Sequence, residues 1–317
     1  MSATASSSAS ITSSMHNLHL PNVERLSPRV VVVRGCNPGP FTGPGTNTYI
    51  VGVGARRVLI DAGDSGVPRY LQLLEQTLRD QCGGARLSSI LVTHSHPDHI
   101  GGVRSVASRV GCADGCAVRK VPWSGNDAGL ALEPVSDGDR LRVDEQTTLE
   151  AVHAPGHAPD HTCWRLLEEH ILFSGDNVLG AGTVVVPAHG GSMREYMASL
   201  RRLQALVSPQ TRILPGHGPP VSASTIGDYI RHREEREAQV HASVAKAAPA
   251  GCTAAELVGV LYRDRFLPWE LRLAATETVH NHLVHLAERG HVMCMPVRAA
   301  SSAHRQDSLD AVWTVAV

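Results

Sequence analysis

One short run, residues 94–99 (His-Ser-His-Pro-Asp-His), constrains this chain more than any other feature. It places three imidazoles and one carboxylate just after the apolar residues 90–92 (Ile-Leu-Val). Neutral imidazole and carboxylate are ligands that zinc-like divalent metals accept. Neither a hydrophobic core nor a plain solvated surface gives a reason to concentrate them. The run therefore predicts a metal-dependent hydrolase.

Three later stretches supply further candidate ligands, and each one follows an apolar run that reads as a strand. They are residues 155–157 (Pro-Gly-His), 175–176 (Gly-Asp) and 215–218 (Pro-Gly-His-Gly). A glycine beside each ligand permits a tight turn and lets the backbone approach a metal. The order and spacing of these stretches make a chance assembly of surface histidines the weaker interpretation.

The ligands can be divided between two metals. Side chains two residues apart in extended backbone point the same way, so His94 and His96 can share one metal. We assign His94, His96 and His157 to the first metal, Asp98, His99 and His217 to the second, and Asp176 as the bridge. Two metals about 3.5–4 Å apart activate water and stabilise a leaving group. Asp98 is also the first candidate catalytic residue, because it can orient that water or transfer its proton.

Composition excludes several classes of protein. The 317 residues carry a formal net charge of -1, which gives no overall attraction to nucleic acid or anionic membrane. No run of about 18 apolar residues is present, so we expect no membrane span. The seven cysteines are odd in number and form no CxxC pair, which favours free thiols in a reducing compartment. We expect a protein of the mitochondrial matrix or cytoplasm that is not secreted.

The chain divides into three predicted parts. Residues 1–21 are rich in Ser, Ala and Thr and contain no acidic residue, which predicts disorder and weakly resembles a transit peptide. Residues 22–247 alternate strand-like and helical runs, which predicts an α/β hydrolase domain. Residues 248–317 read as two helices and two strands, the order of a winged-helix module.

The expected elements follow from hydrophobic periodicity. Strands are predicted at 29–33, 48–51, 58–61, 89–93, 149–153, 161–167, 171–174 and 212–214, and helices at 67–80, 101–110 and 193–207. A polar connecting helix is predicted at 228–247. In the last part we expect a helix starting at Thr253 with a capping box, a helix at 269–289, and strands at 292–295 and 312–315.

Taken together, the four ligand stretches resemble the metallo-β-lactamase superfamily. Asp61, within residues 59–63 (Leu-Ile-Asp-Ala-Gly), is similar to that superfamily's first motif, in which the acid organises the site without binding metal. The resemblance implies an αββα sandwich holding two Zn²⁺ per chain, although iron or manganese accepts the same ligands.

A narrower resemblance, to the β-lactamase-like protein 2 family, rests on residues 23–27, 35–42, 45–49, 175–180 and 229–233 and on the winged-helix unit. It implies a mitochondrial endoribonuclease that cleaves single-stranded RNA. Fungal thioesterases that act on acyl-carrier protein are similar in the same motifs, so a thioesterase or glyoxalase-II-like hydrolase of an acyl thioester is the alternative. A non-catalytic metal-stabilised binding module is a third reading, which the intact ligand set disfavours.

Two departures from this family concern substrate choice. Ser95 stands where the family usually has a bulky aromatic residue, and residues 187–192 are rearranged relative to its acidic segment. Four further residues have a candidate role. His161 is the second candidate catalytic residue, with a strand histidine as the alternative. Asn47 and Thr48 are candidates for substrate binding, and like Thr46 they equally suit turn capping.

The helices predicted at 228–247 and 269–289 carry the basic and histidine residues that bear on nucleic-acid binding. Arg231, Arg233 and Arg236 alternate with glutamates, which predicts a solvated helix face and, as the alternative, contact with RNA phosphate. The helix at 269–289 carries several histidines but no lysine, a poor match to a DNA-recognition helix. We therefore expect no DNA partner, and a winged-helix unit that shapes the cleft or forms a homodimer.

Overall fold

The structure, a computed structural model, describes residues 18–110, 112–127, 129–295 and 308–316. The chain forms two compact units. The first comprises Met1–Ala154, Asp160–Val184 and Leu203–Ile226, and the second comprises Pro155–Pro159, Val185–Arg202 and Gly227–Val317. The predicted disordered segment 1–21 lies largely outside the described residues. The predicted boundary at residue 247 stays a prediction.

A seven-stranded sheet forms one layer of the first unit, with its strands in chain order. Its members are β1 (Val23–Arg25), β2 (Val30–Arg34), β3 (Asn47–Val51), β4 (Arg56–Ile60), β5 (Arg86–Leu91), β6 (Cys112–Lys120) and β7 (Leu132–Pro134). The pairs from β1 to β4 are antiparallel, and those from β4 to β7 are parallel. The parallel half places the carboxyl ends of β4 and β5 at the same edge.

A six-stranded sheet forms the second layer, in the order β13-β12-β11-β10-β9-β8. These strands are β8 (Arg140–Asp144), β9 (Thr147–His153), β10 (Thr162–Leu166), β11 (Ile171–Gly175), β12 (Arg212–Pro215) and β13 (Val221–Ser222). Only β11 and β12 pair in parallel, so both deliver their carboxyl ends to one edge.

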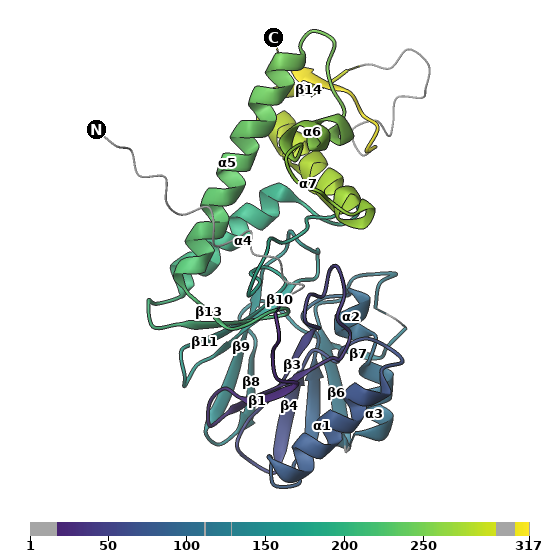
Figure 1. Cartoon of the computed structure of the whole chain (residues 1–317). Helices are drawn as coiled ribbons and strands as arrows, with labels where there is room; N and C mark the ends of the chain where they lie inside the picture. The colour runs from purple at the N-terminus through teal and green to yellow at the C-terminus, as the bar shows by residue number, and fades with distance from the viewer. Residues whose placement is uncertain (1–17, 111, 128, 296–307, 317) are drawn as a thin grey trace, which may run out of the picture. The chain divides into compact units, whose positions relative to one another are not determined.

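The four valines of β2 show why the two sheets stack. All four are buried, because successive side chains of a strand point to opposite faces and both faces of this sheet are covered. Val31 and Val33 pack in a core with α1 (Pro68–Asp80) and α3 (Val103–Arg109), which cover the outer face in Figure 1. Val30 and Val32 share a second core with residues of the other sheet, including Trp164 and Phe173.

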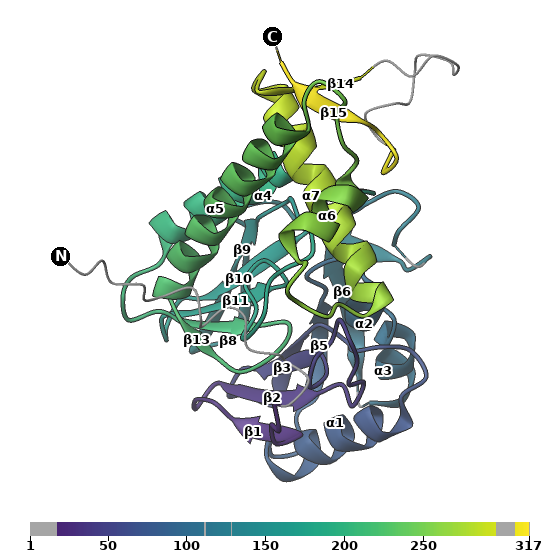
Figure 2. The ribbon, with the colours of Figure 1, turned by 45° about the horizontal axis from the view of Figure 1, so that its top comes forward.

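The second unit is mainly helical. It contains most of α4 (Met193–Leu206) and α5 (Ser224–Ala247), with α6 (Ala254–Leu261), α7 (Trp269–Glu288), β14 (Val292–Cys294) and β15 (Trp313–Val315). Figures 1 and 2 both show α5 and α7 side by side, with the β14–β15 pair at one end. The buried residues Val240, Leu257, Leu283 and Trp313 join these elements in one core.

Most predicted elements are found within a few residues of their predicted bounds. The predicted capping box is confirmed, because the Thr253 hydroxyl accepts from the Glu256 backbone and the Glu256 carboxylate accepts from the Thr253 backbone. Six elements were not predicted: β1, β6, β7, β8, β13 and the short helix at Pro97–Ile100. Among the described residues, every helix is too short or too polar to cross a membrane.

Candidate metal centre

The candidate ligands follow strand ends, as the sequence predicts. β5 ends at Leu91, three residues before His94, and α2 (Pro97–Ile100) starts inside the motif, carrying Asp98 and His99. β11 ends at Gly175 directly before Asp176, and β12 ends at Pro215, two residues before His217. Parallel pairing within each sheet thus brings ligands that are distant in sequence to one edge of the fold.

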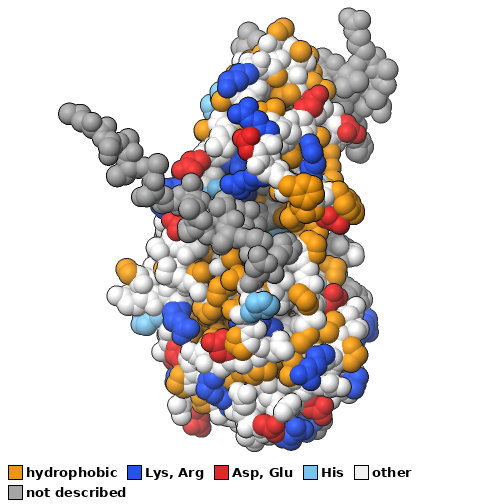
Figure 3. All heavy atoms as spheres, viewed as in Figure 1, with side chains coloured by type: hydrophobic (Ala, Val, Ile, Leu, Met, Phe, Trp, Pro, Cys, Tyr) orange, Lys and Arg blue, Asp and Glu red, His pale blue; other side chains and the backbone are white. Residues whose placement is uncertain are grey.

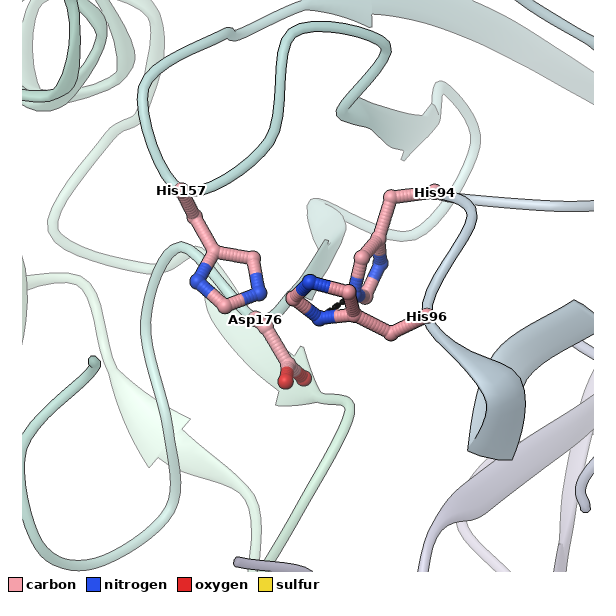
Figure 4. A group of neighbouring side chains, drawn as sticks. All are labelled: His94, His96, His157 and Asp176. Carbon is pink, nitrogen blue, oxygen red and sulfur yellow. Dashed lines mark hydrogen bonds between the residues drawn. The ribbon is translucent and has the colours of Figure 1, made fainter. Parts of the chain in front are cut away.

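All seven predicted ligands fall into two groups of potential metal-binding side chains. One consists of His94, His96, His157 and Asp176, and the other of Asp98, His99 and His217. Within each group the ligand atoms lie within 4.8 Å of one another. Figure 4 shows the four side chains of the first group pointing toward one another, with a contact of 3.0 Å between His94 Nε2 and His96 Nδ1.

Asp176 contacts the second group as well. Its Oδ1 lies 3.4 Å from His99 Nε2, and its Oδ2 lies 3.3 Å from His217 Nε2. Asp98 Oδ2 lies 3.3 Å from the same two nitrogens. A carboxylate that belongs to one group and touches the other is in the position expected of a bridging ligand.

Hydrogen bonds to Asp61 and Thr93 determine which ring nitrogens of His94 and His99 face the metal centre. The Asp61 carboxylate accepts from the Thr93 backbone N–H (2.8 Å) and hydroxyl (3.0 Å), and its Oδ2 lies 2.7 Å from His99 Nδ1. Since a carboxylate only accepts, His99 carries its proton on Nδ1. The Thr93 hydroxyl donates to Asp61, so its oxygen is left to accept from His94 Nδ1 at 3.0 Å. In its neutral form, each of these histidines then has an unprotonated Nε2 facing the centre.

This arrangement fits a bound cation. His99 is fully buried, and its Nε2 makes no hydrogen bond although it faces carboxylate oxygens of Asp98 and Asp176. A lone pair facing two carboxylates in a buried site is unfavourable unless a proton or a metal ion lies between them. The nitrogen and oxygen donors, with no thiolate among them, suit zinc, iron or manganese.

The protonation of the buried histidines at the site depends strongly on the neighbouring carboxylates, and the reverse also holds. Burial disfavours the charged form of His217, but the carboxylates of Asp176 and Asp98 outweigh it and raise the pKa to about 9. The pKa of His99 is also raised well above its ordinary value, against the effect of burial. Conversely, these imidazoles hold the pKa of Asp176 well below its usual range despite burial. At neutral pH the metal centre therefore favours either protonated histidines or bound metal cations.

Asp98 is held by a short chain of hydrogen bonds. The Thr46 hydroxyl donates to Asp98 Oδ2 at 2.8 Å, and Asn37 Nδ2 donates to the Thr46 hydroxyl oxygen at 3.1 Å. The Asn37 side-chain oxygen accepts from the Thr46 backbone at 2.9 Å. For Thr46 we expected turn capping, and we predicted no role for Asn37. No pattern links residue 37 to residue 98, so the sequence carried little signal for this contact.

The other predicted site residues are buried around the centre. His161 Nε2 accepts the Asp176 backbone N–H at 3.0 Å, so it helps to place that ligand. Asn47 donates to the carbonyls of Pro215 (2.9 Å) and Gly218 (2.8 Å), on either side of His217. Thr48 donates to the Val33 carbonyl at 2.7 Å. A catalytic role for His161 and a substrate role for Asn47 and Thr48 stay predictions.

Ser95 and its partners form a buried ionic cluster beside the motif. The Ser95 hydroxyl donates to Asp160 Oδ2 at 2.5 Å, and Lys120 Nζ lies 2.6 Å from the same oxygen and 2.6 Å from Asp127 Oδ1. Lys120 and Asp160 have fully buried side chains. The serine at position 95 thus connects the motif to an acid 65 residues further along the chain, a contact that the sequence did not predict.

Comparison with known proteins agrees with this geometry. Residues 41–217 match the family described as Metallo-beta-lactamase superfamily, and residues 253–293 match the Beta-lactamase associated winged helix domain. A crystal structure of a beta-lactamase domain protein from Burkholderia ambifaria has the same fold, with a TM-score of 0.75, 21% identity and 93% of each chain covered.

Two kinds of curated relative match most of the chain. A Beta-lactamase-like protein 2 homolog from Drosophila melanogaster is 36% identical, covering 86% of this chain and 92% of the relative. An Atrochrysone carboxyl ACP thioesterase, nsrC, from Aspergillus novofumigatus is also 36% identical, covering 87% and 84%. With its ligand set and two-sheet fold, the chain belongs to the metallo-β-lactamase superfamily.

Proposed function

We propose that this protein is a binuclear zinc-dependent hydrolase whose substrate is single-stranded RNA. The observation that carries the hydrolase proposal is the buried convergence of His99 Nε2, Asp98 and Asp176 on one point. When bound there, two divalent ions would activate water and stabilise the leaving group. The seven side chains would hold the ions, with Asp176 shared between them.

Asp98 is proposed as the catalytic residue. One of its oxygens already accepts the Thr46 hydroxyl hydrogen, which fixes the orientation of the carboxylate. Neighbouring His99 and His217 lower the pKa of Asp98, against the effect of burial, so the group is ionised at neutral pH. An oriented carboxylate in this state can accept a hydrogen bond from the attacking water and direct it at the substrate.

RNA is the first choice of substrate because the chain resembles the β-lactamase-like protein 2 homologs over nearly its whole length. Two metal-binding groups side by side also suit the cleavage of a phosphodiester. On the face drawn in Figure 3, basic side chains interleave with acidic ones, so binding of a polyanion would depend on local contacts. A mitochondrial location accompanies this proposal.

An acyl thioester is the second candidate, and the thioesterase relatives favour it. Those relatives match this chain as well as the homologs above do, and the ligand stretches do not separate the two reactions. A neutral pI near 7.0 also suits a small acyl substrate better than a long polyanion.

A parallel assay tests both candidates. Zinc-loaded protein would be offered a single-stranded oligoribonucleotide and a simple acyl thioester, and RNA cleavage without thioester turnover is expected. Asp98→Asn should lower the rate by on the order of 100-fold or more, as loss of a positioned acid–base group does. Asp80→Asn, at an exposed carboxylate on α1, is the matched control and should leave the rate unchanged.

Two results would contradict the proposal. Turnover of the thioester with no cleavage of RNA would replace the first candidate by the second. Retention of metal with no turnover of either substrate would leave a metal-stabilised binding module in place of an enzyme.

A further inference from the structure

The second unit contains a pocket of about 610 Å³ that the proposed reaction does not use. It is lined by residues of α4, α5 and α7 and by Arg289 and His291, which follow α7. Three arginines, four histidines and two glutamates lie on its wall, with few apolar side chains. The volume is in the range of small-molecule sites, and the lining is suited to a charged ligand.

Arginines outnumber acidic residues in the lining of the pocket, three against two. Two of the arginines pair with the two glutamates: Arg201 with Glu234 at 3.0 Å, and Arg289 with Glu237 at 2.6 Å. The third, Arg233, has only 3% of its surface exposed, and its guanidinium lies 5.3 Å from the ring centre of Tyr196. The sequence predicted a solvated Arg233. Arg233 therefore places a third guanidinium on the wall of the pocket.

His282 supplies the second observation. It lines the pocket, it is fully buried, and neither of its ring nitrogens has a hydrogen-bond partner among the described residues. Its Nδ1 lies 3.9 Å from Glu237 Oε2, which is too far for a hydrogen bond but close enough for an electrostatic contact. Buried polar groups normally have a hydrogen-bond partner. A buried imidazole without one, on the wall of a pocket, is therefore suited to form a hydrogen bond with a ligand.

We propose that this pocket binds the phosphate group of a phosphorylated ligand. Guanidinium groups match the oxygens of a phosphate in pairs, and an imidazole N–H adds a further donor. The ion pairs of Arg201 and Arg289 are at the exposed side of the pocket, with 58% and 51% of these side chains accessible. The Arg201 guanidinium can therefore turn to an incoming anion and leave Glu234 in contact with solvent. If Arg289 turns as well, the Glu237 carboxylate, whose side chain is only 16% exposed, keeps His285 Nδ1 at 2.6 Å.

Two sources of phosphate fit the proposed substrates: the 5′ phosphate of an RNA chain, and the phosphopantetheine arm of an acyl-carrier protein. This choice of sources rests on the proposed function. The phosphate site itself does not, because its binding requires no turnover.

Calorimetric titration of the metal-loaded protein with inorganic phosphate tests the site. Since phosphate can also bind metal ions, the titration is repeated on a His96→Ala variant, and the binding event common to both is assigned to the pocket. Arg289→Gln should weaken that event about tenfold, as loss of a charge-assisted hydrogen bond does. Arg272→Gln, at an exposed position of α7 outside the pocket, should leave it unchanged.

A second variant separates recognition from structural damage. Glu234→Gln releases Arg201 from its ion pair and removes a negative charge, so it should tighten phosphate binding, which a merely damaged fold cannot do. Absence of a common binding event up to about 10 mM phosphate, or an event unchanged by Arg289→Gln, would overturn the proposal.

Competition then identifies the source. A 5′-phosphorylated oligoribonucleotide is compared with its 5′-hydroxyl counterpart, and phosphopantetheine with pantetheine. Displacement of inorganic phosphate by only the phosphorylated member of a pair assigns the ligand. Displacement by neither would refute the link between this pocket and the hydrolase substrates, even if RNA or thioester is turned over.

Discussion

Asp61 Oδ2 lies 2.7 Å from Nδ1 of His99, and both side chains are almost completely buried. Asp61 directly follows β4 and adopts a positive φ of 58°, a conformation that non-glycine residues rarely take. That turn aims the carboxylate behind the metal groups. One acid thus orients His99 directly and His94 through the Thr93 hydroxyl.

The first prediction concerns this acid. Asp61→Asn can offer its amide N–H to His99, which would move the imidazole proton to Nε2 and turn the ligand atom into a donor. We expect a loss of about 10- to 100-fold in metal affinity, as for other partners of metal-ligating histidines. Metal content after dialysis against a graded chelator measures it.

Asp64→Asn is the control for this change. Asp64 lies three residues further on, and its carboxylate accepts from the Ser65 backbone N–H. Equal metal retention by the two variants would show that Asp61 does not set the orientation of the ligands.

The second prediction tests how closely the backbone approaches the ligands. A Cβ added at Gly216 would lie 2.2 Å from Asp176 Oδ1 and 2.9 Å from His99 Cε1. Gly216→Ala must therefore displace Asp176 or His99, and we expect loss of metal binding while the circular dichroism spectrum is retained. Gly54→Ala, whose Cβ would meet its nearest neighbour at 3.4 Å, is the control. Normal metal content in Gly216→Ala would contradict the geometry.

The third prediction concerns Lys120, one of only two lysines in the chain. Lys120→Met would leave the buried Asp160 without its cation, and breaking a buried pair in this way costs about 3–5 kcal/mol of unfolding free energy. Chemical denaturation measures the change, with Lys246→Met on the exposed end of α5 as the control. A loss equal to that of the control would mean that water reaches Asp160.

The ligands of the metal centre could be predicted because the sequence carries them locally. Each sits next to glycine or proline directly after an apolar strand, and strand ends gather at one edge in a parallel arrangement. Periodicity likewise predicted α1, α4 and α7, whose apolar residues recur on one face.

Other features depend on contacts between distant positions. β6 includes Gly115 and ends in Arg119 and Lys120, so its polar sequence does not read as a strand, although it pairs with β5 throughout its second half. Lys120, Asp160 and Ser95 meet only when the two sheets stack. The pocket of the second unit was not predicted for the same reason, because its arginines and histidines come from α4, α5, α7 and the residues that follow α7.

The fourth prediction concerns pH and the second unit. Burial opposes ionisation of Glu237, but contacts with His282 and His285 outweigh it and lower the pKa from 4.5 to about 2. A depressed carboxyl pKa stabilises the fold above pH 4.5, and this contribution is lost as the pH falls toward 2. Glu237→Gln should therefore reduce stability at pH 7 but much less at pH 2. A difference from the original protein that does not change with pH would exclude this ionisation as its cause.

The last prediction follows from the raised histidine pKa values at the metal centre. Without metal, carboxylates raise the pKa of His217 to about 9 and that of His99 well above its ordinary value, so both imidazoles hold protons at pH 7. Metal ions bind the deprotonated rings, so loading the metal-free protein at pH 7 should release about two protons per chain. Calorimetry in buffers of different ionisation enthalpy measures this release, which should shrink as the pH rises past 9. Binding heats that do not depend on the buffer would mean that His99 and His217 are unprotonated at pH 7 in the metal-free protein. Their lone pairs would then lie close to the carboxylate oxygens without a proton between them.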